Sequence, residues 1–126
     1  VPHAPIRFDS FILVFYNIMV FECESQAMSQ PDVQAFHDEA TFTVTYVVSD
    51  PATRTAAIVD PVHDFDAASG RISTASADEV IDYVRREGLE IEWILETHVH
   101  ADHLSGAPYL QEQLGGRIAI GANVSE

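Results

Sequence analysis

The chain has 126 residues, of which 47% are hydrophobic, and a formal net charge of −14 at pH 7. This apolar content is enough for one domain with a buried core and excludes a disordered chain. A surface this acidic repels phosphate, so we expect neither nucleic acid nor a membrane as a partner. The single cysteine, Cys23, excludes an internal disulfide, and we expect a cytoplasmic location.

The first 27 residues contain an apolar run, FILVFYNIMVF at residues 11–21, which is too short to cross a bilayer as a helix. Three interpretations stay open. The segment could be non-native upstream sequence, because Met28 opens a polar stretch that looks like a true start. It could be a signal peptide with Ser25 and Ala27 at its cleavage site, or a real apolar strand or helix. We therefore treat residues 1–27 as a doubtful extension and residues 28–126 as the domain.

Residues 41–49 form a β-branched and aromatic run that predicts a strand. Turn residues follow, and residues 55–59 predict a second strand, so the two should pair as a β-hairpin. We expect a polar loop over residues 62–74, which carry several acids and a glycine.

A helix is predicted next, from a Ser76-x-x-Glu79 capping box to a C-terminal Gly88. We then expect a strand at 91–97, a helix over about 104–114 with Pro108 in its first turn, and a strand at 117–121. The order of β-hairpin, helix, strand, helix and strand predicts an α/β fold.

The stretch from Thr97 to His103, THVHADH, places three imidazoles and a carboxylate within six residues, between a predicted strand and a predicted helix. Neutral imidazole with carboxylate suits Zn, Fe or Mn. His98 and His100 are two residues apart and share one side of an extended segment, and Asp102 and His103 can approach after a turn. A chance cluster of surface histidines is the alternative. We predict a metal site made of His98, His100, Asp102 and His103, with Asp102 also the candidate catalytic residue.

These residues, His98-Val-His-Ala-Asp-His103, resemble the signature loop of the metallo-β-lactamase superfamily. The segment from Ala57 to Pro61 resembles the early strand of that family that closes on an aspartate. The resemblance implies the first half of an αββα sandwich, in the order β-hairpin, helix, strand, metal loop, helix and strand. The longer segment from Glu96 to Ala107 most resembles the persulfide dioxygenase branch and its bacterial β-lactamase-like relatives.

The resemblance also implies roles for single residues. In dinuclear members, the residues matching His98 and His100 bind one ion, and those matching Asp102 and His103 bind the second. In persulfide dioxygenases one iron is held, and only the residue matching His98 is a direct ligand among these four. The residue matching Asp60 supports the metal loop. The implied cofactor is Fe(II) or Zn(II), as one or two ions, and no other cofactor site is predicted.

Both schemes need further ligands, at least one histidine and one aspartate, yet no His, Asp or Cys follows Gly106. His37 and His63 we interpret as solvated loop residues, and neither His3 nor Cys23 is given a role. We therefore expect a truncated domain, with the remaining ligands outside this chain, weak metal binding, and an exposed apolar sheet face that self-associates or forms a homo-oligomer.

The expected function is that of a persulfide dioxygenase that oxidises glutathione persulfide. One alternative is a glyoxalase II-like thioester hydrolase with a dinuclear site. The other is an incomplete fragment that acts only as a binding piece or has no function alone. In the enzyme interpretations the partner is a small thiol-derived substrate, either the persulfide or a thioester.

Overall fold

The computed structural model describes residues 30–125, so the expectations for residues 1–27 lie outside the described residues. The described elements follow one another along the chain as β1 (Asp32–Asp38), β2 (Thr43–Ser49), β3 (Thr55–Val59), β4 (Val62–Asp66), β5 (Arg71–Ser73), α2 (Ala75–Glu87), β6 (Glu90–Glu96), β7 (Leu104–Ser105), α3 (Ala107–Leu114), β8 (Arg117–Ile120) and the 3-10 turn η1 (Ala122–Ser125).

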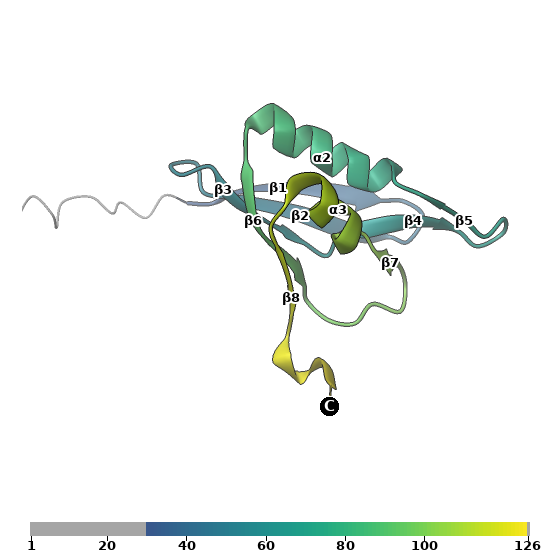
Figure 1. The fold of residues 1–126 in the computed structure, drawn as a ribbon. Helices are drawn as coiled ribbons and strands as arrows, with labels where there is room; N and C mark the ends of the chain where they lie inside the picture. The colour runs from purple at the N-terminus through teal and green to yellow at the C-terminus, as the bar shows by residue number, and fades with distance from the viewer. Residues whose placement is uncertain (1–29, 126) are drawn as a thin grey trace, which may run out of the picture.

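Five strands form the main sheet, in the order β1-β2-β3-β6-β8 (Figure 1). The first three strands are antiparallel neighbours, whereas β3 and β6, and then β6 and β8, run parallel. Helix α2 connects β3 to β6 by way of the β4-β5 hairpin, and α3 connects β6 to β8. Strands β5, β4 and β7 form a second, three-stranded sheet. The predicted α/β layering is confirmed, and it corresponds to part of an αββα fold.

The hydrophobic core lies between the main sheet and the two helices. Ile58 of β3, Ile94 of β6 and Leu110 of α3 are all 0% exposed. They pack in one cluster with the apolar stripe of α2, which includes Val80 and Val84. Because both helices contribute to the same cluster, they cover the same face of the sheet, as Figure 1 shows for α2 above the strands.

The opposite sheet face carries apolar side chains that are partly open to solvent. Successive strand residues alternate between faces, so Tyr46 points away from its buried neighbour Val47. Tyr46 is 40% exposed, and Val33 of β1, on the same side, is 59% exposed. Self-association through this face stays a prediction. Within residues 30–125, no helix is long and apolar enough to cross a bilayer.

The hairpin of β2 and β3, the helix ending at Gly88, and the strands β6 and β8 were all predicted and are confirmed. Gly88 adopts the left-handed conformation, with φ of 62°, that ends a helix favourably. Strand β1 was not predicted. Its residues are mostly exposed, so the sequence carries no clear apolar alternation for an edge strand.

The expected loop at 62–74 is wrong, because β4 and β5 form a hairpin there. The Asp66 carboxylate makes its turn by accepting hydrogen bonds from Ala68 N at 2.9 Å and Ser69 Oγ at 2.6 Å. Gly70 supplies a φ of 69°.

The predicted capping box is also wrong. The cap of α2 is Thr74, with no side-chain bond to the backbone. The hydroxyl of Ser76 instead donates to Asp64 Oδ1 at 2.5 Å, and its N–H donates to Asp64 Oδ2 at 3.0 Å. The second helix begins at Ala107 rather than near Leu104, because Leu104 and Ser105 pair with β4. Pro108 does lie in its first turn, as predicted.

Candidate metal centre

The candidate site lies at the edge where the parallel strands of the main sheet end. Strand β3 ends at Val59 and the neighbouring β6 ends at Glu96, so Asp60 and Thr97 leave the sheet side by side. Residues 97–103 then form the predicted metal loop, before the chain returns in β7. The carboxyl ends of parallel strands are where α/β proteins commonly place their ligands.

Asp60 lies at a sharp turn that is fixed by its neighbours. Its φ is 50°, a left-handed value that aspartate tolerates better than most residues. Its N–H donates to Leu95 O at 2.8 Å, and its own carbonyl accepts the Thr45 hydroxyl at 2.9 Å. Thr45 is buried at 4% exposure, and its hydroxyl also accepts Val62 N at 3.3 Å. The turn therefore presents the Asp60 carboxylate rigidly to the loop.

The Asp60 carboxylate collects three donors from the metal loop. Its Oδ1 accepts Thr97 N at 2.7 Å, and its Oδ2 accepts the Thr97 hydroxyl at 2.7 Å. His100 Nε2 also lies 2.9 Å from Oδ1. Desolvation alone would raise the pKa of Asp60, but the bonds from Thr97 and His100 outweigh it and lower that pKa. An ionised Asp60 favours a proton on His100 Nε2, so Nδ1 is the ring nitrogen that faces Asp102.

The three predicted histidines stand in a row, which we call the imidazole row (His98, His100 and His103). The ring centroids of His98 and His100 are 4.1 Å apart, and those of His100 and His103 are also 4.1 Å apart. The side chain of His103 is 0% exposed and that of His100 is 9% exposed. Both ring nitrogens of His103 are buried with no hydrogen-bond partner.

Asp102 lies beside the two inner rings and is about half exposed. Its Oδ1 is 3.3 Å from His103 Nδ1 and 3.6 Å from His100 Nδ1. A hydrogen bond from its own backbone N–H lowers the pKa of Asp102. The charges of His103 and His100 also lower it, and together these effects outweigh the opposite effect of desolvation. The carboxylate is therefore ionised next to two imidazoles, which is the state in which it binds a cation.

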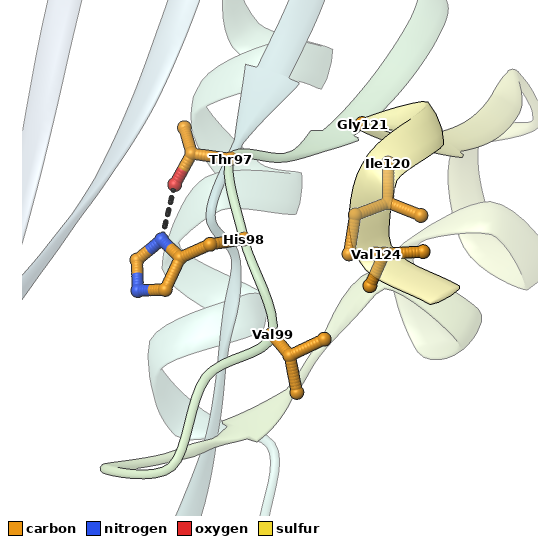
Figure 2. A pocket seen from close by; sticks show the side chains of 6 residues that line it. All are labelled: Thr97, His98, Val99, Ile120, Gly121 and Val124. Atoms are coloured by element: carbon orange, nitrogen blue, oxygen red, sulfur yellow. Dashed lines mark hydrogen bonds between the residues drawn. The ribbon is translucent and has the colours of Figure 1, made fainter. Parts of the chain in front are cut away.

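His98 occupies the outer, exposed end of the row. Its Nδ1 lies 2.8 Å from the Thr97 hydroxyl, and its ring points away from the apolar side chains that line the neighbouring pocket (Figure 2). That pocket is lined by Thr97, His98, Val99, Ile120, Gly121 and Val124. Val99 points toward Val124, on the other side of the loop from the His98 ring (Figure 2). A second pocket is lined by the three imidazoles of the row together with Val99, Ile118 and Ile120, so the candidate ligands and apolar side chains share one hollow of the surface.

The donors fit a divalent ion, with one difference from the predicted set. Ligand atoms of His100, Asp102 and His103 all lie within 4.8 Å of one another, whereas His98 is not part of that group. A buried imidazole without partners costs free energy, and a bound cation would compensate for it. Imidazole and carboxylate together suit Zn or Fe. The metal-ligand roles of the four residues, and the supporting role of Asp60, stay predictions.

Three residues at this site were not predicted to take part in it. Thr97 donates two hydrogen bonds to the Asp60 carboxylate. Glu96 places Oε2 at 3.3 Å from His100 Nε2, and its Oε1 accepts the hydroxyl of Ser105. The available signal was that all three residues lie within two positions of the motif at residues 98–103.

His37 and His63 were predicted to be loop residues, but the structure places both of them in strands. His37 lies in β1, where its side chain is exposed. His63 lies in β4, and its ring stacks on Tyr109 with centroids 6.3 Å apart. Both were called loop residues because their strands, β1 and β4, were missed. Neither belongs to a metal-ligand group among residues 30–125.

Comparison with known proteins matches residues 39–125 to the model of the metallo-beta-lactamase superfamily. A beta-lactamase hydrolase-like protein of Agrobacterium fabrum is 54% identical over 102 residues, which make up 81% of this chain and 24% of that protein. Glyoxylase B2 of Dictyostelium discoideum is 44% identical over 79 residues, 63% of this chain and 27% of that protein. The mitochondrial persulfide dioxygenase ETHE1 of Bos taurus is 34% identical over 74 residues, 59% of this chain and 25% of that protein.

Among solved structures, ETHE1 from Myxococcus xanthus superposes with a TM-score of 0.60 at 27% identity, over 73% of this chain and 36% of that one. The chain spans about a quarter of the length of the curated relatives that it matches first. The superfamily binds divalent metal ions, and the names of these relatives include hydrolases and a dioxygenase.

Proposed function

Because the chain belongs to the metallo-beta-lactamase superfamily, we propose that it provides the metal loop of a persulfide dioxygenase that oxidises glutathione persulfide. The observation that carries this proposal is the difference in exposure along the imidazole row. His98 is exposed at the mouth of a pocket, whereas the side chains of His100 and His103 are 9% and 0% exposed. That difference suits a single ion held by His98, with the inner residues fixing its surroundings.

In this proposal, each residue of the metal loop would have a separate role. His98 would hold an Fe(II) ion together with ligands outside residues 30–125, and the ion would supply the redox chemistry with O₂. Asp60 and Thr97 would hold the loop, and His100 would support His98 by ring contact. Val99, Ile118 and Ile120, which line one pocket with the imidazole row, would exclude water beside a small thiol-derived substrate.

A glyoxalase II-like thioester hydrolase is the second candidate, and a specific observation favours it. His100, Asp102 and His103 form a compact group of donors, which suits schemes in which the inner residues are ligands themselves. Two ions would then generate a hydroxide nucleophile at neutral pH. The similarity to glyoxylase B2 supports the same alternative.

Metal content and substrate turnover of the full protein separate these candidates. We expect one iron per chain, O₂ uptake with glutathione persulfide, and no cleavage of a glutathione thioester. Substitution of His98 by Ala should abolish iron binding, whereas His37→Ala, on the exposed face of β1, should leave it unchanged. Two ions per chain with thioester cleavage would favour the hydrolase. A protein that binds metal but turns over neither substrate would favour a binding piece.

We also propose a cytoplasmic protein that self-associates through the sheet face bearing Tyr46 and Val33. Light scattering should give a mass above the 13.9 kDa of the chain, with uptake of a dye that binds apolar surface. Replacing Tyr46 by Lys should reduce both signals. A monomer that binds no dye would contradict this proposal.

A further inference from the structure

The metal loop leaves the main sheet at Glu96 and returns at Ser105, and these two side chains meet. The Ser105 hydroxyl donates to Glu96 Oε1, which closes the loop at its base. The side chain of Glu96 is only 10% exposed, whereas Ser105 is open to solvent. Loop residues between them include all four predicted ligands.

The returning end of the loop is itself anchored. The Ser105 oxygen accepts Ala107 N at 3.1 Å, so it also satisfies a free donor in the first turn of α3. Gly106 N donates to Pro61 O at 2.7 Å, and a Cβ at Gly106 would lie 2.7 Å from Val62 O. Backbone packing this close leaves Ser105 little freedom, so the position of Glu96 is determined by a rigid partner.

The second oxygen of Glu96 faces the imidazole row. Its Oε2 is buried, has no hydrogen-bond partner, and lies 3.3 Å from His100 Nε2. The same nitrogen lies 2.9 Å from Asp60 Oδ1. One ring N–H of His100 therefore faces two carboxylates, one from each of the neighbouring strand ends. Asp60 accepts a hydrogen bond from this nitrogen and Glu96 adds a second negative charge beside it, so the two together restrict rotation of the ring more than Asp60 alone.

We propose that Glu96 is a positioning residue. Together with Ser105 it closes the base of the metal loop, and it fixes the His100 ring at Nε2. The expected effect on metal affinity rests on the proposed metal site, whereas the contacts of Glu96 with His100 and Ser105 do not. A rival is that Glu96 binds an ion directly with Asp60 and His100, whose ligand atoms lie within 4.8 Å of one another. The 2.9 Å contact between His100 and Asp60 favours a hydrogen bond instead.

The test uses four variants of the full protein. Glu96→Gln removes the charge, and Ser105→Ala removes the hydroxyl that holds it. Ser105→Thr keeps a hydroxyl and serves as the conservative rescue. Glu112→Gln, on the exposed side of α3, is the matched control for loss of an acid. Two quantities are measured: the nitrogen and N–H resonances of His100 in the metal-free protein, and the affinity for Zn(II) and Fe(II) by competition with a chelator.

We expect Glu96→Gln and Ser105→Ala to shift and broaden the Nε2–H resonance of His100. Both should weaken metal binding by roughly 10-fold or more, the usual effect of losing a residue that orients a ligand. Ser105→Thr and Glu112→Gln should match the parent protein in both measurements. Thermal unfolding of each metal-free variant shows whether it is folded, and the resonances are compared only among folded ones.

Unchanged His100 resonances in both Glu96→Gln and Ser105→Ala would overturn the inference, even if the protein binds metal. Complete loss of metal in Glu96→Gln with no effect of Ser105→Ala would also overturn it, because Glu96 would then be a ligand. If the parent protein bound no metal while the resonances shifted as expected, the positioning role would stand and the proposed function would fail.

Discussion

The helix-covered face of the main sheet and its metal-loop edge both bury side chains, but with opposite chemistry. Ile58 and Ile94 are 0% exposed under the helices, where they belong to a cluster of buried apolar side chains. At the edge, the side chain of His103 is also 0% exposed, yet neither ring nitrogen has a hydrogen-bond partner, and the nearest charge to Nδ1 is the Asp102 carboxylate at 3.3 Å. The same degree of burial thus stabilises the fold in one region and costs free energy in the other.

The cost at the edge is informative because folding does not require it. Burial of an apolar side chain contributes about 1.5–3 kcal/mol, whereas a buried polar group without a partner costs about 1–3 kcal/mol. A sequence selected for stability alone would place an apolar residue at His103. We infer that the imidazole row is maintained for a ligand, and each prediction below tests one side of this contrast.

The largest effect is expected in the core. Replacing Ile94 by Ala should lower the free energy of unfolding by about 2–5 kcal/mol, because a fully buried isoleucine leaves a cavity. Ile72 of β5 is 56% exposed, and the same change there should cost less than about 1 kcal/mol. Urea denaturation of the metal-free protein measures both. Equal losses would mean that the helix-covered face is not the main source of stability.

The second prediction concerns His103, where the effects on stability and on binding should have opposite signs. Replacing His103 by Leu should raise the free energy of unfolding of the metal-free protein by about 1 kcal/mol, because two buried nitrogens without hydrogen bonds are removed. The same change should weaken metal binding at least roughly 10-fold. His37→Leu, on an exposed edge strand, is the control. A His103→Leu protein that is less stable without metal would show that the ring is needed for packing.

The core side of this comparison was largely predictable from the sequence, because it follows from local periodicity. The apolar stripe of α2 and the runs of β2, β6 and β8 each repeat at the spacing of their element. The misses were elements whose residues are mainly polar or exposed. Strands β1 and β4 form because their backbones pair with a neighbouring strand. The residues AFHD of β1 and HDFD of β4 have no local pattern from which this pairing could be predicted.

At the site, the sequence predicted the four residues of the motif and Asp60, which the structure places at one sheet edge. It did not predict how they are held. The bonds from Thr97 to Asp60 join residues 37 positions apart, and Ser76 bonds Asp64 rather than the helix start. Such partners are chosen by the packing of strands, so a spacing rule such as the capping box cannot identify them.

The third prediction addresses the hydrogen bonds that hold the metal loop. Replacing Asp60 by Asn keeps the shape of the side chain but removes the negative charge of the carboxylate that accepts hydrogen bonds from Thr97 and His100. Metal affinity should fall about 10-fold to 100-fold. Asp82→Asn, on the exposed side of α2, should leave the affinity unchanged. Calorimetric titration with Zn(II) measures the affinity of both variants. Equal affinities of Asp60→Asn and Asp82→Asn would mean that Asp60 does not support the metal loop.

The smallest effect concerns a polar contact that belongs to the helix-covered face rather than to the edge. Asp78 of α2 accepts the Thr74 hydroxyl at 2.8 Å and the Tyr109 hydroxyl of α3 at 2.8 Å. The bond from Thr74, followed by that from Tyr109, lowers the pKa of Asp78 below its ordinary value of about 3.9. Unlike the nitrogens of His103, which have no hydrogen bonds, both oxygens of the Asp78 carboxylate accept a hydrogen bond.

A carboxyl group with a lowered pKa in the folded state adds stability above its unfolded pKa, and this contribution is lost as the pH falls through the folded value. Stability should therefore decrease between about pH 4 and the lower pKa of Asp78, and Asp78→Asn should make that decrease smaller. Tyr109→Phe removes one of the donors and should have part of the same effect, whereas Asp82→Asn should have none. Urea denaturation at a series of acidic pH values measures the slopes. An unchanged slope in Asp78→Asn would mean that the contact between the two helices adds nothing beyond their apolar packing, and the contrast between the two regions would then rest on the core residues alone.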